Sequence, residues 1–270
     1  MIWEADPATL IVLALLVGGY AAFALALKRW PTVIQLIAFS GAILAIVGAL
    51  TGPVDELVKQ RSFALYIFQQ LVLVFIAPPL ILAGTPDWMA RPVLTHRLIE
   101  PLARFLTRPL VAYILFGAAF ALVHFPPVCD RVCHVHPVYG DVDTVLLLVG
   151  LILWFPLLSP LPEYPRLSYP MQVMYIFLLM IPMTAVAAPI TMAQSVVYIY
   201  YVEGPHPFGL SPMADQVLGG IIMWVGQGVY LMFVFSAIFF RWARREDETP
   251  PFNRRPVPLR PLPRQRSHAI

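Results

Sequence analysis

The chain has 270 residues, of which 59% are hydrophobic and only 12% are charged, and its formal net charge is +3. A soluble domain carries about 25% charged residues, so this composition excludes an ordinary soluble protein and indicates a chain solvated mainly by lipid. The basic residues form no stripe interleaved with aromatic residues, which argues against a nucleic-acid-binding surface.

Seven apolar stretches approach the length needed to cross about 30 Å of hydrocarbon as a helix. Backbone groups in lipid must be hydrogen-bonded within their own segment, and long apolar runs achieve this as helices. The sequence therefore predicts an all-α, polytopic membrane helix bundle with seven transmembrane helices, formed by residues 1–245. The stretches lie near 8–27, 33–51, 63–84, 110–125, 143–159, 170–197 and 217–240, and the fourth and fifth are short.

The basic residues are divided unequally between the two sets of connecting segments. One set, which includes Lys28, Arg29 and the arginines from Arg241 onward, holds 15 of the 18 basic residues, whereas the other holds Lys59, Arg61 and Arg131. Short cytoplasmic loops carry an excess of Lys and Arg. We therefore expect the N-terminus outside and the C-terminus in the cytoplasm.

Two segments on the expected cytoplasmic side differ from the spans. Residues 246–270 contain six prolines and five arginines and should form a disordered tail, for which an inert role and contact with anionic lipid are the two interpretations. The loop 85–109 has an apolar rhythm between Thr95 and Leu106, which predicts a short helix at the membrane interface.

The outer loop between the fourth and fifth spans gathers most of the metal-binding side chains. His124 precedes a pair of thiols with three residues between them, Cys129 and Cys133, and the imidazoles of His134 and His136 follow. Thiolates and imidazoles suit copper and zinc, so a metal site is one interpretation. A disulfide is another, because an oxidising compartment favours it, and free thiols are the third.

Polar groups within the spans are few. Gln69, Gln70 and Gln227 are explained by hydrogen bonds between helices, while ionisable residues are lacking at every midplane. A proton-coupled transporter or a haem site needs such residues, so both are disfavoured. The outer-loop residues Tyr198, Tyr200 and Tyr201 are expected to anchor the membrane interface. Neither a nucleotide-binding loop nor a catalytic motif is present, so we expect no enzyme.

Several segments, taken in order, resemble the CtaG-type cytochrome c oxidase assembly family over about residues 8–242. The more specific ones are Ala77-Pro78-Pro79-Leu80 in the third span and Asp215-Gln216-x-x-Gly219-Gly220-x-x-Met223-Trp224 at the start of the last. Weaker matches are His124-Phe-Pro126 and Trp154-Phe-Pro156. The match leaves out only the tail.

The resemblance implies a multi-pass protein of the bacterial inner membrane that is needed to make an active haem-copper oxidase. Copper delivery on the outer face is the implied act, with oxidase subunits and periplasmic copper chaperones as partners. Carried over by position, His124 matches the family's histidine before a proline, and Asp215 and Gln216 match its acidic–amide pair. Asp215 has a structural interpretation as well, since an aspartate in the first turn can cap a helix.

One departure from the family pattern affects the expected copper site. The family typically has two histidines flanking Met-x-Gln in the third span, whereas this chain has Tyr66 and Gln70 there, with Gln69 retained between them. Tyr and Gln are poor ligands for soft metals. Our hypothesis is that the cysteines and histidines of the outer loop replace this site. One alternative is a stably bound oxidase subunit or scaffold without metal. Another is a copper permease, which is less favoured because the sequence offers no continuous series of metal ligands across the bilayer.

Overall fold

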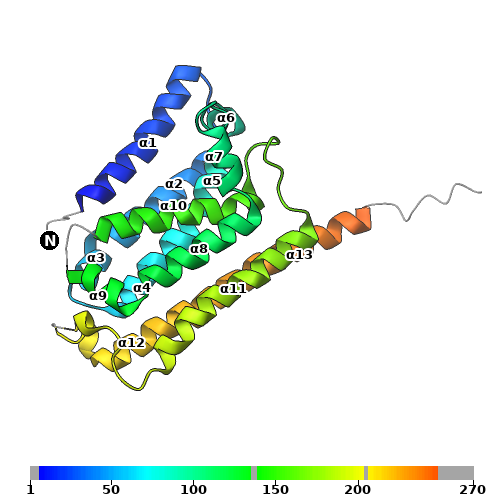
Figure 1. Ribbon diagram of the computed structural model, residues 1–270. Coiled ribbons are helices and arrows are strands. Elements are labelled where there is room, and N and C mark those ends of the chain that lie inside the picture. The colour runs from blue at the N-terminus through cyan, green and yellow to red at the C-terminus, as the bar shows by residue number, and fades with distance from the viewer. Residues whose placement is uncertain (1–5, 135–138, 204–205, 249–270) are drawn as a thin grey trace, which may run out of the picture.

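The structure is a computed structural model that describes residues 6–134, 139–203 and 206–248. The regular secondary structure in these ranges is helical, and β-strands do not occur in them. The long helices lie side by side in one bundle, as Figure 1 shows. The predicted all-α class is therefore confirmed.

The bundle begins with the apolar helices α1 (Pro7–Leu27) and α2 (Val33–Leu50), and α3 (Gly52–Lys59) follows α2 after one residue. Asp6 caps α1 by accepting a hydrogen bond from the Ala8 N–H at 3.0 Å. Thr32 and Gln35 form a capping box at the start of α2. Helix α1 lies at the edge of the bundle (Figure 1), and only 6% of its apolar stretch is buried, so most of its surface faces outward.

The third apolar stretch is the centre of the bundle. It consists of α4 (Phe63–Leu71), one π-helical segment η1 (Val72–Ile76) and α5 (Ala77–Gly84). In this stretch 67% of the residues are buried, the highest share among the candidate spans, because helices pack around it on several sides. Gly84 allows α2 to pack closely on this stretch, since a Cβ there would lie 2.6 Å from the backbone nitrogen of Phe39 in α2.

Pro78 explains a hydrogen bond that joins this central stretch to a later helix. A proline has no N–H, so it leaves the carbonyl four residues earlier without its usual helical donor. That carbonyl belongs to Val74, and it accepts a hydrogen bond from the indole N–H of Trp154 at 2.8 Å. The neighbouring proline repeats the arrangement: Pro79 frees the Phe75 carbonyl, which accepts from the Tyr230 hydroxyl at 2.5 Å.

The next segment turns sharply at the end of the bundle opposite α3 and α9 (Figure 1). It contains α6 (Asp87–Leu94), α7 (Glu100–Leu106) and the apolar helix α8 (Pro109–Val123), with α7 and α8 meeting at an angle of 75°. The short helix expected between Thr95 and Leu106 is thus present, but it begins only at Glu100.

Three further helices follow: α9 (Pro126–His134), α10 (Tyr139–Leu158) and α11 (Tyr169–Met192). Pro182 within α11 frees the carbonyl of Leu178, and the hydroxyl of Tyr113 on α8 donates to it at 3.2 Å. Prolines within these apolar helices therefore create acceptors that hold neighbouring helices together.

The last part of the described chain begins with two short 3₁₀ segments, η3 (Ile199–Tyr201) and η4 (Pro207–Gly209). A long apolar helix follows as α12 (Pro212–Ile221), the π-helical segment η5 (Ile222–Gly226) and α13 (Gln227–Glu248). The predicted tail starts at 246, whereas α13 continues to Glu248; residues 249–270 lie outside the described ranges.

All seven expected apolar stretches are helical, but fewer meet the length and composition of a membrane span. Five helices do so, and a sixth span results if α7 and α8 are counted together. The remaining one, α10, contributes a shorter apolar helix over Val142–Leu158. The protein is therefore a multi-pass membrane protein with five or six spans by this criterion, and the prediction of seven spans is not confirmed.

The bundle has two ends that matter for function. The His124 end, as we call it, carries α3, α9 and the first turns of α4 and α12; the Arg104 end carries α6 and α7 (Figure 1). The prediction that the tyrosines after α11 anchor the membrane interface is wrong. Tyr198 and Tyr201 are each only 1% exposed, and Tyr200 is also buried, because their rings pack into the core at the His124 end.

Candidate functional site

His124 is the residue at which α8 ends, and its side chain is buried. Its Nδ1 lies 2.8 Å from the carbonyl oxygen of Phe120, one turn earlier. A carbonyl oxygen can only accept, so Nδ1 carries the proton and the neutral ring has its lone pair on Nε2. That Nε2 is buried and has no hydrogen-bond partner in the described part of the chain.

The backbone of His124 is fixed as firmly as its ring. Its carbonyl accepts a hydrogen bond from the Tyr198 hydroxyl at 3.0 Å, and its ring packs on Phe120 with centroids 4.3 Å apart. The ring of Tyr198 in turn stacks on Phe63 at the start of α4. The imidazole is therefore held in one orientation, as a ligand or a binding residue would be.

The two cysteines lie on a helix rather than in an irregular loop. Helix α9 begins two residues after His124 and places Cys129 and Cys133 at positions i and i+4, on one face. Cys129 is buried in the core. Such positions separate the Cβ atoms by about 5–6 Å, whereas a disulfide needs about 3.5–4.5 Å. The three interpretations of this pair, a disulfide, a metal site and free thiols, stay predictions.

The other two predicted ligands, His134 and His136, follow the cysteines in the sequence. His134 ends α9, and His136 lies outside the described residues. Among the described side chains, three or more His, Cys, Asp or Glu residues do not converge on one point. The five-residue metal set of His124, Cys129, Cys133, His134 and His136 thus stays a prediction.

The three polar positions of the third span differ in what they do. Gln69 donates from Nε2 to the Ala49 carbonyl on α2 at 2.7 Å, which is the interhelical role expected for it. Gln70 is buried, and neither atom of its amide has a hydrogen-bond partner among the described residues. A buried, unsatisfied amide is costly, and bound ligands commonly satisfy such groups. Tyr66 lies one turn before Gln70, between the rings of Phe63 and Tyr201.

Asp215 caps a helix, but the helix is not its own. Ser211 caps α12 by accepting from the Ala214 N–H, and the Asp215 carboxylate instead reaches the first turn of α4. It accepts hydrogen bonds from the N–H of Phe63 at 2.5 Å and from the hydroxyl of Ser62 at 3.0 Å. A buried negative charge at a helix N-terminus is stabilised by the helix dipole and these donors.

Gln216 connects the last helix to the end of α11. Its Oε1 accepts from the Val197 N–H at 2.6 Å, and its Nε2 lies 3.3 Å from the Ile190 carbonyl and 3.4 Å from that of Ser195. The last carbonyls of a helix have no partner within the helix, so this amide supplies a donor where α11 ends.

The two glycines that follow let α12 approach its neighbours closely. A Cβ at Gly219 would lie 2.5 Å from the Phe63 ring, and a Cβ at Gly220 would lie 3.0 Å from the Cα of Thr191. Together, Asp215, Gln216 and the glycines join α12 to α4 and α11. This part of the motif is therefore explained by packing at the His124 end.

Sequence reasoning missed two residues that stabilise the His124 end through contacts with a residue distant in sequence. Arg61 donates to the Tyr200 carbonyl at 3.3 Å, and its guanidinium lies 4.7 Å from the centre of the Tyr200 ring. Asp130 on α9 accepts from the Tyr200 N–H at 3.1 Å. The cluster of tyrosines at 198–201 is the signal that could have indicated a buried contact.

Comparisons with known proteins agree with the resemblance. A sequence model of the family described as "Cytochrome c oxidase caa3 assembly factor" matches residues 18–245. Uncharacterized proteins of Mycobacterium bovis and Mycobacterium tuberculosis are each 29% identical over 91% of this chain, and one of Mycobacterium leprae is 26% identical over the same share. The chain spans only 40% of the length of these relatives. No solved structure matches it.

Proposed function

Since the chain belongs to the cytochrome c oxidase caa3 assembly factor family, we propose that it holds copper at the His124 end and passes it to a haem-copper oxidase. One observation carries the proposal. Helix α9 puts two cysteines one turn apart, directly after a buried histidine whose Nε2 lone pair has no partner among the described residues.

The donor set suits this cargo. Thiolates bind Cu(I), and imidazole accepts either oxidation state of copper. Cys129 and Cys133 would hold the ion, while His124, His134 and His136 would complete the site or receive the metal next. The protein would bind the copper ion and release it to the next protein without catalysing a reaction, so we assign it no enzymatic activity.

The distribution of charge supports an outward-facing site. Arginines are concentrated at the Arg104 end and along the tail, whereas the connections at the His124 end carry Lys59, Arg61 and Arg131. By the positive-inside rule, the His124 end would face the periplasm of a bacterial inner membrane, with the N-terminus on the same side. Periplasmic copper chaperones would then be donors and oxidase subunits acceptors.

The test measures copper binding and oxidase activity together. A Cys129→Ser/Cys133→Ser double variant should lose most of the copper bound per purified chain, and it should fail to restore oxidase activity in membranes of a deletion strain at limiting copper. Added copper should rescue the activity. His206→Gln, at a histidine outside the predicted metal set, is the control. Normal copper binding by the double variant would rule out this site.

A second candidate is a stably bound oxidase subunit or scaffold without metal. Two observations favour it: Tyr66 and Gln70 replace the histidines of the family pattern, and the Asp215–Gly220 motif is engaged in packing. Copurification with the mature oxidase in a fixed ratio, with no copper in the isolated chain, would favour this candidate. Association only during assembly would favour a transient factor. A copper permease would instead transport labelled copper into vesicles.

A further inference from the structure

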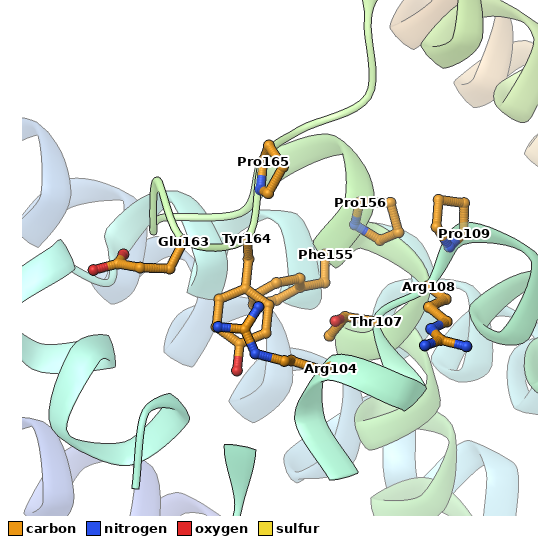
Figure 2. A pocket seen from close by; sticks show the side chains of 9 residues that line it. All are labelled: Arg104, Thr107, Arg108, Pro109, Phe155, Pro156, Glu163, Tyr164 and Pro165. Carbon is orange, nitrogen blue, oxygen red and sulfur yellow. The ribbon is translucent and has the colours of Figure 1, made fainter. Parts of the chain in front are cut away.

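A cavity of about 280 Å³ opens at the Arg104 end, far from the residues discussed above (Figure 2). Its walls come from α7, the turn into α8, the end of α10 and the connection after α10. Side chains that line it include Arg104, Arg108, Glu163 and Tyr164. The volume would hold several water molecules or one small polar headgroup.

The charged side chains that line this cavity favour the binding of an anion. Glu163 is paired with Arg91, and Figure 2 shows it on the far side of Tyr164 from Arg108. Arg104 pairs with Glu100 at 2.8 Å and lies over the Tyr164 ring. Arg108 forms no ion pair with a carboxylate in the described part of the chain, so its guanidinium is available.

The position of Arg108 relates the cavity to the membrane surface. It immediately precedes Pro109, the first residue of the apolar helix α8, and therefore lies at the level where a span leaves the hydrocarbon. It is also the N-cap residue of α8, which lacks a side-chain cap, so the positive end of the helix dipole adds to the local potential.

Helix α7, which contributes Arg104 to the cavity wall, also carries exposed apolar side chains. Helix α7 meets α8 at 75° and so runs across the direction of the span. Around it, Leu98, Leu102 and Phe105 are exposed by 81%, 58% and 51%. A helix with this arrangement lies in the membrane interface with its apolar side chains among the acyl chains. An occupant of the cavity would thus have an anionic head beside arginine and a hydrocarbon part beside these residues.

We infer that this cavity binds the phosphate of an anionic phospholipid, with Arg108 as its main contact and Arg104 as a second. A guanidinium presents several donors to phosphate oxygens in a planar fork. In a zwitterionic lipid, the headgroup's own cation already compensates the charge of the phosphate. The inference requires only that the Arg104 end lies at a membrane surface, and it is independent of the copper site.

The test uses the full chain purified in neutral detergent and native mass spectrometry. It compares phosphatidylglycerol, phosphatidylcholine with the same acyl chains, and inorganic phosphate. We expect phosphatidylglycerol to bind in preference to phosphatidylcholine. Arg108→Gln should lower that preference about tenfold, the effect of losing one charge-assisted hydrogen bond. Arg108→Lys, which keeps the charge without the fork, should lose only part of it.

Arg97→Gln is the matched control, because it removes the same charge from the same loop outside the cavity. An equal loss of preference in Arg97→Gln would mean general surface charge and overturn the inference. So would equal binding of the two lipids by the native chain. Competition by inorganic phosphate at concentrations similar to the lipid would instead identify a site for a soluble anion. If Arg108→Gln does not fold, Arg104→Gln provides the same comparison.

Discussion

The carboxylate of Asp215, on the last long helix, accepts a hydrogen bond from the backbone N–H of Phe63 at the start of the central span. The two residues are 152 positions apart in sequence. A helix N-terminus in the core needs an acceptor for its free N–H groups, and here a distant helix supplies a charged one. The acidic residue of the family motif thus has a role in the fold that does not depend on metal.

Asp215→Asn should destabilise the bundle by about 2 kcal/mol, because it replaces charge-assisted hydrogen bonds with neutral ones. Thermal unfolding in detergent, followed by circular dichroism, measures this. Copper bound per folded chain should stay unchanged. A variant of native stability that has lost copper would show instead that Asp215 acts on the metal.

Trp154→Phe should cost about 1–2 kcal/mol, since it removes the donor to the carbonyl that Pro78 frees and keeps most of the ring packing. A more specific test compares the cost of this substitution with and without Pro78. In a Pro78→Ala background the backbone regains an N–H, so the same substitution should cost less. Equal costs in both backgrounds, by thermal unfolding, would contradict the link.

Gly220→Ala should destabilise the protein by about 1–3 kcal/mol, because the new methyl group would press on the backbone and side chain of Thr191. Gly18→Ala is the matched control, because a Cβ there meets no atom within 4 Å. It should be neutral or slightly stabilising through helix propensity. Similar melting temperatures for both variants would argue against close packing of α12 on α11.

A Tyr66→His/Gln70→His variant restores the two histidines of the family pattern on one face of α4. It should bind about one more copper ion per chain, since imidazoles at i and i+4 can share a metal. The extra ion should persist when Cys129 and Cys133 are replaced by serine. Gln69→His, whose position faces the Ala49 carbonyl on α2, should add none. Metal analysis of the purified chains distinguishes these outcomes.

The positions of the long helices could be predicted from the sequence because hydrophobic length is a local property. Each apolar stretch became a helix, and Thr95–Leu106 correctly indicated a short helix. The number of spans could not be obtained in this way. A sharp bend separates α7 from α8, and such a bend depends on how these helices pack.

The candidate site was harder to predict because its parts meet only in three dimensions. Asp215 suggested a cap, yet nothing local to it could indicate that Phe63 and Ser62 are its donors. Tyr198 resembled an interfacial anchor by composition, and only its contact with the His124 carbonyl reveals why it is buried. The spacing of Cys129 and Cys133, by contrast, suggested a turn or one helical turn, and both residues lie within the helix α9.

The prolines of the central span have a consequence for how this protein is made. Residues 63–84 leave the ribosome with two carbonyls, those of Val74 and Phe75, that lack their usual donors within the helix. The donors for them, Trp154 and Tyr230, lie 80 and 155 residues further along the chain. Unsatisfied carbonyls are costly in hydrocarbon. The innermost helix therefore reaches its stable state only when the helices that carry Trp154 and Tyr230 have entered the bilayer, so the insertion of these later helices is the step that closes the bundle.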